Sequence, residues 1–303
     1  MEKVDRMNMK HHYGDYKTIL SPQNGMNIYR GCSHGCIYCD SRSKCYEMNH
    51  DFEDIEVKRN APEILEQELC RKRKKAMIGT GSMCDPYIPP ERELKYTRRC
   101  LEAIEKHGFG LSILTKSDLI LRDLDLLTAI NEKAKCVVQM TLTTFDDDLC
   151  KKIEPNVSLT SERAATLKTI SEAGIPTAVW LCPILPFIND TMENLEGILS
   201  YCKEANVKAI VDFGFGVTLR EGSRDYFFPK LDERFPGMAE KYGKTFGNSY
   251  ECPSPDNSRL YRRFAEFCRE NNIMYDLKNI FNYLWEYKEK EEEEQLSFNL
   301  FDL

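Results

Sequence analysis

Three cysteines lie close together near the start of the chain. Cys32 and Cys36 are separated by three residues, and Cys36 and Cys39 by two. Three thiolates on one short loop can each bind one iron of a cubane cluster, and the fourth iron then has no protein ligand. An open metal position is typical of a reactive site, whereas structural metal sites have a complete ligand set. The spacing therefore predicts a redox-active 4Fe–4S cluster.

A zinc site is the alternative for the same cysteines. It would need a fourth ligand such as His34 or Cys45. Zinc-binding domains usually repeat a pair of cysteines that are two residues apart, and the sequence contains one such pair, Cys36 and Cys39. The cluster is therefore favoured, and a non-catalytic zinc or iron–sulfur binding module is kept as an alternative. The other cysteines are scattered singly, which is typical of small buried apolar residues.

Several segments of the sequence resemble a known family. The cysteine spacing, with Tyr38 directly before the third cysteine, resembles the signature of radical S-adenosylmethionine (SAM) enzymes. The segments 23–39, 85–91, 114–117 and 175–190 resemble more particularly the spore photoproduct lyase-like subgroup of that superfamily. The resemblance extends over about residues 15 to 215.

This resemblance implies a cofactor and a type of reaction. Cys32, Cys36 and Cys39 are expected to bind three irons of the cluster, and SAM the fourth through its amino and carboxylate groups. The reduced cluster would cleave SAM to a 5′-deoxyadenosyl radical, which would abstract a hydrogen atom from a substrate that the sequence does not identify. An electron donor such as a flavodoxin or a ferredoxin is the implied partner. A DNA repair lyase of the spore photoproduct type is the alternative reaction.

The elements that must position the cysteines are short strands that alternate with helices. Strand-like runs lie at 27–30, 76–82, 111–116, 136–143, 177–183 and 208–213. Near-continuous apolar runs are typical of parallel strands covered by helices, and repeated strand–helix units form right-handed crossovers. We therefore predict an α/β fold, an incomplete (βα)6 TIM-like barrel with a C-terminal extension. The polar clusters follow the strands, at the end where such barrels have their active sites.

The chain is divided into four predicted segments. Residues 1–22 are a lead-in, 23–213 the partial barrel, 214–288 a lid loop followed by helices, and 289–303 an acidic tail with a short apolar motif. A single helix is expected over 91–107 and another over 257–271, because apolar residues recur there at helical spacing.

The first candidates for SAM binding follow the second and third predicted strands. A polar nucleoside needs backbone donors and charged partners. Gly79, Thr80, Gly81 and Ser82 stand where the superfamily presents its backbone to the methionyl amino group, although glycines at a strand end often only form a turn. Lys116 is the candidate partner of the SAM carboxylate, and an exposed lysine is the alternative.

Further SAM-binding candidates lie on the fourth and fifth predicted strands. Gln139, Thr141 and Thr143 alternate along one strand and so share one face. Polar side chains inside a barrel are costly unless they bind something, which predicts ribose or substrate contacts. Leu181 begins a segment that resembles the support of the adenine, with a plain core position as the alternative.

Cys84 and Tyr96 are the catalytic candidates. Spore photoproduct lyases have a cysteine near this position that donates a hydrogen atom. An alignment on Asp85 places Ser82 rather than Cys84 at that donor position, which disfavours photoproduct repair. Cys84 would still point the same way as Ser82 in an extended chain.

The composition limits the partners and the compartment. The 303 residues carry a net charge of −7, which disfavours a dedicated nucleic-acid groove, although a local basic face is compatible with it. No apolar run is long enough to cross a bilayer, and thirteen cysteines without an export signal predict a reducing cytoplasm. The motif at 295–301 resembles sliding-clamp-binding peptides, and a tail that folds back onto the barrel is the favoured alternative.

Overall fold

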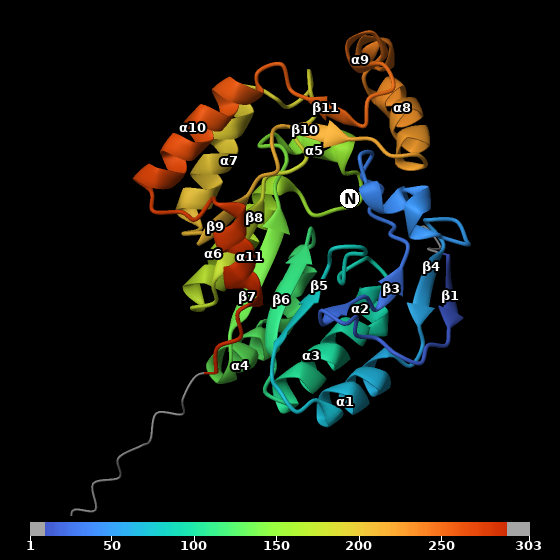
Figure 1. The fold of residues 1–303 in the computed structure, drawn as a ribbon, viewed down its shortest axis with the longest axis vertical. Helices are drawn as coiled ribbons and strands as arrows, with labels where there is room; N and C mark the ends of the chain where they lie inside the picture. Colours follow the sequence, from blue (N-terminus) through green and yellow to red (C-terminus); the bar gives the residue numbers. More distant parts are fainter. Residues whose placement is uncertain (1–9, 290–303) are drawn as a thin grey trace, which may run out of the picture.

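The computed structural model describes residues 10–289, whose centre is a six-stranded sheet (Figure 1). Its strands are β2 (Gly25–Met26), β5 (Met77–Thr80), β6 (Gly110–Thr115), β7 (Cys136–Thr141), β8 (Thr177–Trp180) and β9 (Ala209–Val211), in the order β2-β5-β6-β7-β8-β9. Every neighbouring pair is parallel, and within the described residues β2 and β9 are the two edges of the sheet. The predicted α/β fold with an open barrel is confirmed.

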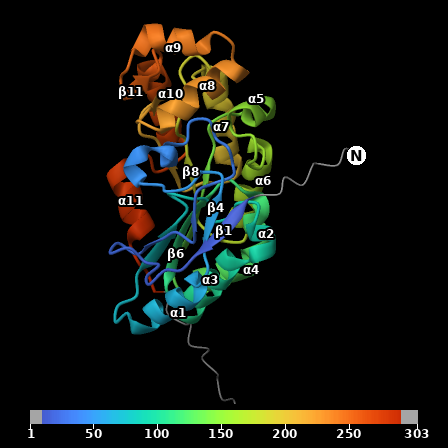
Figure 2. The same ribbon diagram turned by 90° about the vertical axis from the view of Figure 1, so that its right-hand side faces the viewer.

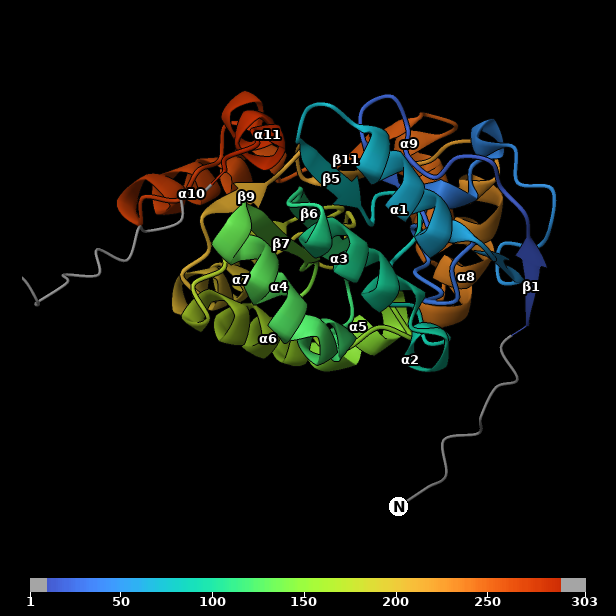
Figure 3. The same ribbon diagram turned by 90° about the horizontal axis from the view of Figure 1, so that it is seen from below.

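Helices cover the convex face of the sheet (Figure 3). They are α1 (Ala61–Arg71), α3 (Tyr96–Lys106), α4 (Leu124–Lys133), α6 (Thr160–Glu172) and α7 (Met192–Glu204). The strand residues that face them are apolar and fully buried, for example Ile113, Val138 and Val179. The alternate residues of each strand therefore point to the barrel interior.

Helix α11 (Leu277–Trp285) packs on the concave face of the sheet, on the side opposite to α4 and α6 (Figure 2). Its Ile280 and Leu284 form one apolar cluster with Val137 of β7 and Val211 of β9. The part of the barrel interior between α11 and the sheet is thus filled by the protein's own side chains.

The beginning of the chain differs from the prediction for 27–30. Gly25–Met26 is the strand of the main sheet, whereas β3 (Tyr29–Arg30) pairs antiparallel with β4 (Ile55–Lys58). β4 also pairs in parallel with β1 (His11–Gly14), so the three strands form a second sheet. Strands of two to four residues are too short to leave a periodic signal in the sequence.

The helix predicted for 91–107 is broken. α2 (Glu91–Leu94) ends at Lys95, whose φ of +54° lies in the left-handed region, and α3 starts one residue later. The carboxylate of Glu91 accepts the backbone N–H of Thr97 at 3.1 Å, so it satisfies a free donor in the first turn of α3. The break is therefore stabilised by a residue of the preceding helix.

Residues 214–256 are not one long loop. They form β10 (Gly216–Thr218), α8 (Ser223–Arg234), α9 (Met238–Phe246) and β11 (Glu251–Pro253), and β10 pairs antiparallel with β11. Pro229 inside α8 and several glycines concealed the helical pattern. The predicted helix at 257–271 is confirmed as α10 (Asn257–Glu270).

Short helical elements complete the described chain. They are η1 (Asp40–Arg42), η2 (Lys44–Tyr46), η3 (Asp118–Asp123) and α5 (Asp147–Ile153). None of the helices in the described part of the chain combines the length and the apolar character that crossing a bilayer requires. The motif at 295–301, and with it the sliding-clamp prediction, lies outside the described residues.

Candidate metal and cofactor site

Cys32, Cys36 and Cys39 line one cavity of about 90 Å³ at the carboxyl ends of the strands. A single tetrahedral zinc ion, with Zn–S bonds of about 2.3 Å, would hold its sulfur ligands about 4 Å apart. Among the described residues, the one group of three ligand atoms that lie within 4.8 Å of one another does not include these cysteines. At least one pair of these thiols is therefore more than 4.8 Å apart, which is farther than the sulfur ligands of a single zinc ion.

The cysteine loop is held by backbone hydrogen bonds to the end of α5. The N–H of Ile37 donates to the carbonyl of Ile153 at 3.0 Å. Asn156 donates its backbone N–H to the carbonyl of His34 at 3.1 Å and its side-chain amide to Ser33 at 2.9 Å. These bonds position the loop independently of any bound group.

A buried ion pair lies beneath the same loop. Arg163 on α6 contacts the carboxylate of Glu154 at 2.6 Å, and both side chains are fully buried. Arg163 also donates to the carbonyl of Thr141, and the hydroxyl of Tyr38 donates to Glu154. Burial alone would raise the pKa of Glu154, but the charges of Arg163 and Lys116 outweigh it and lower the pKa. The carboxylate is therefore ionised and links the cysteine loop to β7.

Lys116 follows β6 and points to the cysteines. Its Nζ lies 4.0 Å from a carboxylate oxygen of Glu154 and stacks over the ring of Tyr38. Burial would lower the pKa of Lys116, but the neighbouring Cys36 and Glu154 raise it above its usual range. The structure thus places a half-buried cation beside the cysteines.

Asp85 fixes the ends of β5 and β6 at this cavity. Its carboxylate accepts the hydroxyl of Thr115 at 2.7 Å, the N–H of Lys116 at 2.7 Å and the N–H of Tyr87 at 2.8 Å. His34 of the cysteine loop lies 3.5 Å away. No role was predicted for Asp85 from the sequence, although it lies in the loop that follows the buried strand β5.

A second, larger cavity of about 620 Å³ adjoins the first. The residues that line both are Cys39, Ser41, Gly81, Ser82, Leu114, Lys116 and Thr141. Trp180, Cys182 and Phe213 contribute to the far wall, together with residues of β10 and β11. The cysteines therefore lie at the inner end of a space that can hold a nucleoside and a further molecule.

Four of the predicted SAM-binding residues line both cavities. They are Gly81, Ser82, Lys116 and Thr141. Gly81 has a φ of +101°, and a Cβ there would lie 1.9 Å from the carbonyl oxygen of Leu114. A glycine is therefore required at this strand end.

Two other candidates are occupied by contacts within the protein. A Cβ on Gly79 would lie 2.4 Å from the ring of Trp285, so this glycine makes room for α11. The amide of Gln139 donates to Ser112 at 2.9 Å and accepts the indole N–H of Trp180 at 2.8 Å. The polar groups of Gln139 are thus satisfied without a ligand.

Three more candidates lie outside both cavity linings. Thr80 and Thr143 are buried, and the hydroxyl of Thr143 has no hydrogen-bond partner. Leu181 is fully buried in the apolar cluster between the sheet and the helices. Its neighbours Cys182 and Pro183 line the larger cavity instead.

The two catalytic candidates lie in different places. Cys84 lines the smaller cavity, where its thiol donates to the carbonyl oxygen of Gly31 at 2.8 Å. Tyr96 is on α3, outside both cavity linings, and its hydroxyl donates to the carbonyl of Arg59 at 2.9 Å. The structure brings Cys84 to the cysteine loop and does not bring Tyr96 there.

Asp212, directly after β9, is a buried acid that the sequence analysis missed. One of its carboxylate oxygens has no hydrogen-bond partner. Burial raises the pKa of Asp212 to about 6, although the N–H of Gly214 partly offsets this effect. It is followed by Phe213, which is 58% exposed and lines the larger cavity.

The protonation of Asp212 predicts a pH dependence of stability. The native carboxyl keeps its proton up to a pH of about 6, whereas the unfolded chain releases it near pH 4. The folded state binds more protons between these values, so this residue lowers the free energy of unfolding as the pH rises, by up to about 3 kcal/mol. Urea unfolding from pH 4 to 8 should show this decline relative to Asp212→Asn. Identical pH profiles of the two proteins would contradict it.

Comparison with known proteins identifies uncharacterized relatives. The protein Rv2578c of Mycobacterium tuberculosis is 28% identical over 257 residues, which cover 83% of this chain and 75% of that protein. The protein MJ0683 of Methanocaldococcus jannaschii is 36% identical over 167 residues, which cover 54% of this chain and 61% of that protein.

Solved structures of spore photoproduct lyase have a similar fold. The lyase complexed with dinucleoside spore photoproduct has a TM-score of 0.60 at 14% identity and covers 88% of this chain and 81% of its own. A variant with bound AdoMet and dinucleoside spore photoproduct has a TM-score of 0.59 at 14% identity, covering 83% and 74%. At this level of identity the likeness concerns the fold.

The match to a family model identifies the protein family of this chain. The model of the radical SAM superfamily matches residues 26–202, which is more than half of the chain and includes the cysteine loop and strands β5 to β8. Members of this superfamily are enzymes that use a 4Fe–4S cluster and SAM, and they need a reductant. With its three thiols on one cavity and its open parallel sheet, the chain belongs to the radical SAM superfamily.

Proposed function

We propose that this protein reductively cleaves SAM at a 4Fe–4S cluster bound by Cys32, Cys36 and Cys39 and abstracts hydrogen from a substrate in the larger cavity. The observation that carries the proposal is the continuity of the two cavities. The thiols lie at the inner end, and a space of about 620 Å³ opens in front of them. A cluster with one open iron has room there for an organic ligand.

The residues shared by both cavities are suited to SAM. Lys116, whose side chain is partly exposed to the cavity, offers a positive charge to the carboxylate of the methionyl group. Gly81 packs closely against the backbone of Leu114, and its own backbone lines both cavities, where it can offer polar groups to the amino end. The hydroxyl of Thr141 faces the same space and can bond to the ribose.

When bound, the cluster and SAM supply one-electron cleavage of the sulfonium C–S bond and a 5′-deoxyadenosyl radical. The chain itself orients the reactants and excludes water. Cys36 and His34 are buried at the closed end of the site. A one-electron donor of the flavodoxin or ferredoxin type is the proposed partner.

The substrate side of the larger cavity is formed by aromatic and small residues. Trp180 and Phe213 lie together, with ring centroids 5.8 Å apart, and face β10 and β11 across the cavity. Cys84, the residue considered for photoproduct repair, does not line this cavity, and its thiol donates a hydrogen bond to the carbonyl of Gly31, next to Cys32. We therefore do not propose lesion repair and leave the substrate unassigned.

The test is SAM cleavage by anaerobically reconstituted protein. With dithionite as the reductant and no added substrate, the protein should contain about four irons and four sulfides per chain and release 5′-deoxyadenosine. Uncoupled cleavage makes a substrate unnecessary for this assay. One tightly bound zinc without iron or sulfide, or an iron–sulfur protein that leaves SAM intact, would refute the proposal.

A further inference from the structure

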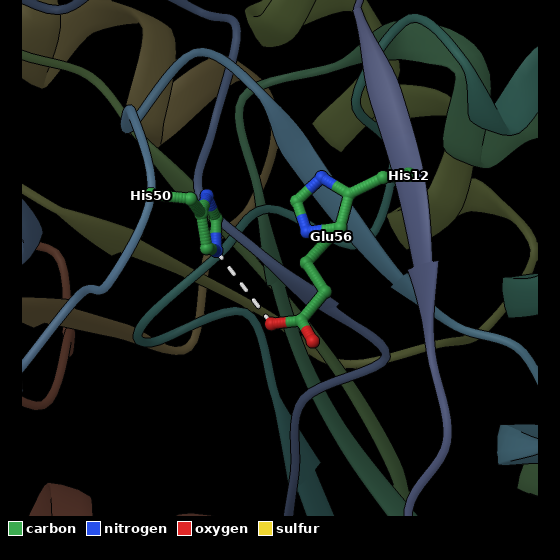
Figure 4. A group of neighbouring side chains, drawn as sticks. All are labelled: His12, His50 and Glu56. Atoms are coloured by element: carbon green, nitrogen blue, oxygen red, sulfur yellow. Dashed lines mark ion pairs between the residues drawn. The ribbon is translucent and has the colours of Figure 1, made fainter.

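The small second sheet contains a group of side chains that no part of the proposed reaction uses. His12 of β1, His50 of the loop after η2, and Glu56 of β4 each offer a ligand atom, and these atoms lie within 4.8 Å of one another (Figure 4). His12 and Glu56 are direct partners in the parallel β1–β4 register, so they stand side by side on one face. Figure 4 shows the ring of His50 directed at the Glu56 carboxylate from the facing loop.

The atoms that face each other in this group lack hydrogen-bond partners. His50 Nε2 and one carboxylate oxygen of Glu56, Oε2, are buried without a partner and lie 3.6 Å apart. The guanidinium of Arg30 is 3.8 Å from the same oxygen, which is too far for a hydrogen bond. Buried polar atoms without partners are costly, and an ion between them would satisfy both.

Each histidine is already oriented by a bond at its other nitrogen. Nδ1 of His12 lies 3.1 Å from the carboxylate of Asp54, and Nδ1 of His50 lies 3.0 Å from the carbonyl oxygen of Asp51. A proton on each Nδ1 leaves Nε2 free as a lone-pair donor. Metal-binding histidines are usually fixed in this way, by a carboxylate or a carbonyl behind the ring.

We propose that His12, His50 and Glu56 bind a divalent transition metal ion, with zinc as the ion that two imidazoles and one carboxylate suit best. The set leaves one coordination position for water. His50 and Asp54 line a cavity of about 520 Å³, through which the ion can enter. The site is separate from the cysteines, which line other cavities.

The ion would connect the start of the chain to the cysteine loop. His50 belongs to the same segment as Phe52, whose carbonyl accepts the N–H of Cys32 at 2.9 Å. Metal binding by a folded protein stabilises the fold that provides the ligands. The site therefore acts as a structural clamp between β1, β4 and the segment 47–54.

The experiment uses protein with the iron–sulfur cluster reconstituted, so that Cys32, Cys36 and Cys39 are occupied. After treatment with a chelating resin, Zn²⁺ is titrated against a chromophoric chelator. We expect one equivalent to bind, with nitrogen and oxygen neighbours in the zinc X-ray absorption spectrum. The melting temperature should rise on binding.

Variants of the ligands and of an unrelated histidine decide the outcome. His50→Ala and Glu56→Gln should weaken zinc binding more than about 100-fold, and Asp54→Asn about 10-fold, because partners behind the ligands typically change affinity by 10 to 100-fold. His107→Ala is the control, since His107 also pairs with a glutamate, at 2.9 Å, but lacks a third ligand. If His50→Ala does not fold, the isosteric Glu56→Gln carries the test. Sulfur neighbours, or equal affinities of Glu56→Gln and His107→Ala, would overturn the site.

Discussion

A Cys36→Ala variant is expected to lose both the cluster and the cleavage of SAM. Cys36 is buried, and the hydrogen bond from the N–H of Ile37 to the carbonyl of Ile153 fixes its loop, so its thiol is held in place as a ligand. Loss of a residue that only hydrogen-bonds to a metal ligand already reduces metal affinity by about 10 to 100-fold. Loss of a direct ligand should reduce it further. The release of 5′-deoxyadenosine should fall by more than about 100-fold.

Cys100→Ala is the matched control for this experiment. Cys100 is fully buried in the core between α3 and the sheet and lines neither of the two cavities. Its replacement should leave the iron and sulfide content and the SAM cleavage close to those of the parent protein. Iron analysis, the visible spectrum and product chromatography measure the comparison. A Cys36→Ala protein that retains the cluster would show that the loop does not supply three iron ligands.

The strands and the cysteine loop could be predicted because their signals are local. Mostly apolar runs such as 136–141 mark strands that are buried on both faces. The spacing of Cys32, Cys36 and Cys39 specifies a cluster without reference to any other segment. The repeated strand–helix units, which form right-handed crossovers, then led to the prediction of an incomplete barrel.

The interior of the barrel could not be predicted, because it depends on a segment far away in the sequence. Gly79 and Gln139 were assigned to SAM from their place on the strands, but Trp285 fills the space at Gly79 and Trp180 bonds to Gln139. Nothing near Gly79 in the sequence indicates that a helix some two hundred residues later packs there. A polar residue inside a barrel can thus be satisfied by the protein as well as by a ligand.

The support of the cysteine loop was hidden for the same reason. Glu154 directly follows α5 and Arg163 lies on α6, and both resemble ordinary charged residues of helices in the sequence. Only the fold shows that both are fully buried and that Tyr38 bonds to Glu154. Asp85 belongs to a segment that resembles the family, yet its two hydrogen bonds to the end of β6 appear only in three dimensions.

Replacing Arg163 by methionine should therefore destabilise the protein strongly. The variant keeps much of the side-chain volume but removes the cation nearest to the buried carboxylate of Glu154, which leaves Lys116 at 4.0 Å as the remaining positive charge. Removing one member of a buried ion pair costs about 3–5 kcal/mol of the free energy of unfolding. Urea unfolding of the parent and the variant at pH 7 measures the difference. Reconstitution should also yield less cluster, because Glu154 bonds to Tyr38 of the cysteine loop.

Two further variants distinguish the buried pair from charge effects in general. Lys230→Met removes an exposed pair, in which Nζ lies 2.6 Å from Glu233, and should cost less than about 1 kcal/mol. Adding Glu154→Gln to Arg163→Met removes the unpaired charge, so the double variant should recover part of the lost stability, with a coupling of about 0.5–3 kcal/mol. If Arg163→Met is no less stable than Lys230→Met, the buried pair does not support the cysteine loop. If the double variant shows no recovery, the cost lies in lost packing of α6 rather than in the isolated carboxylate.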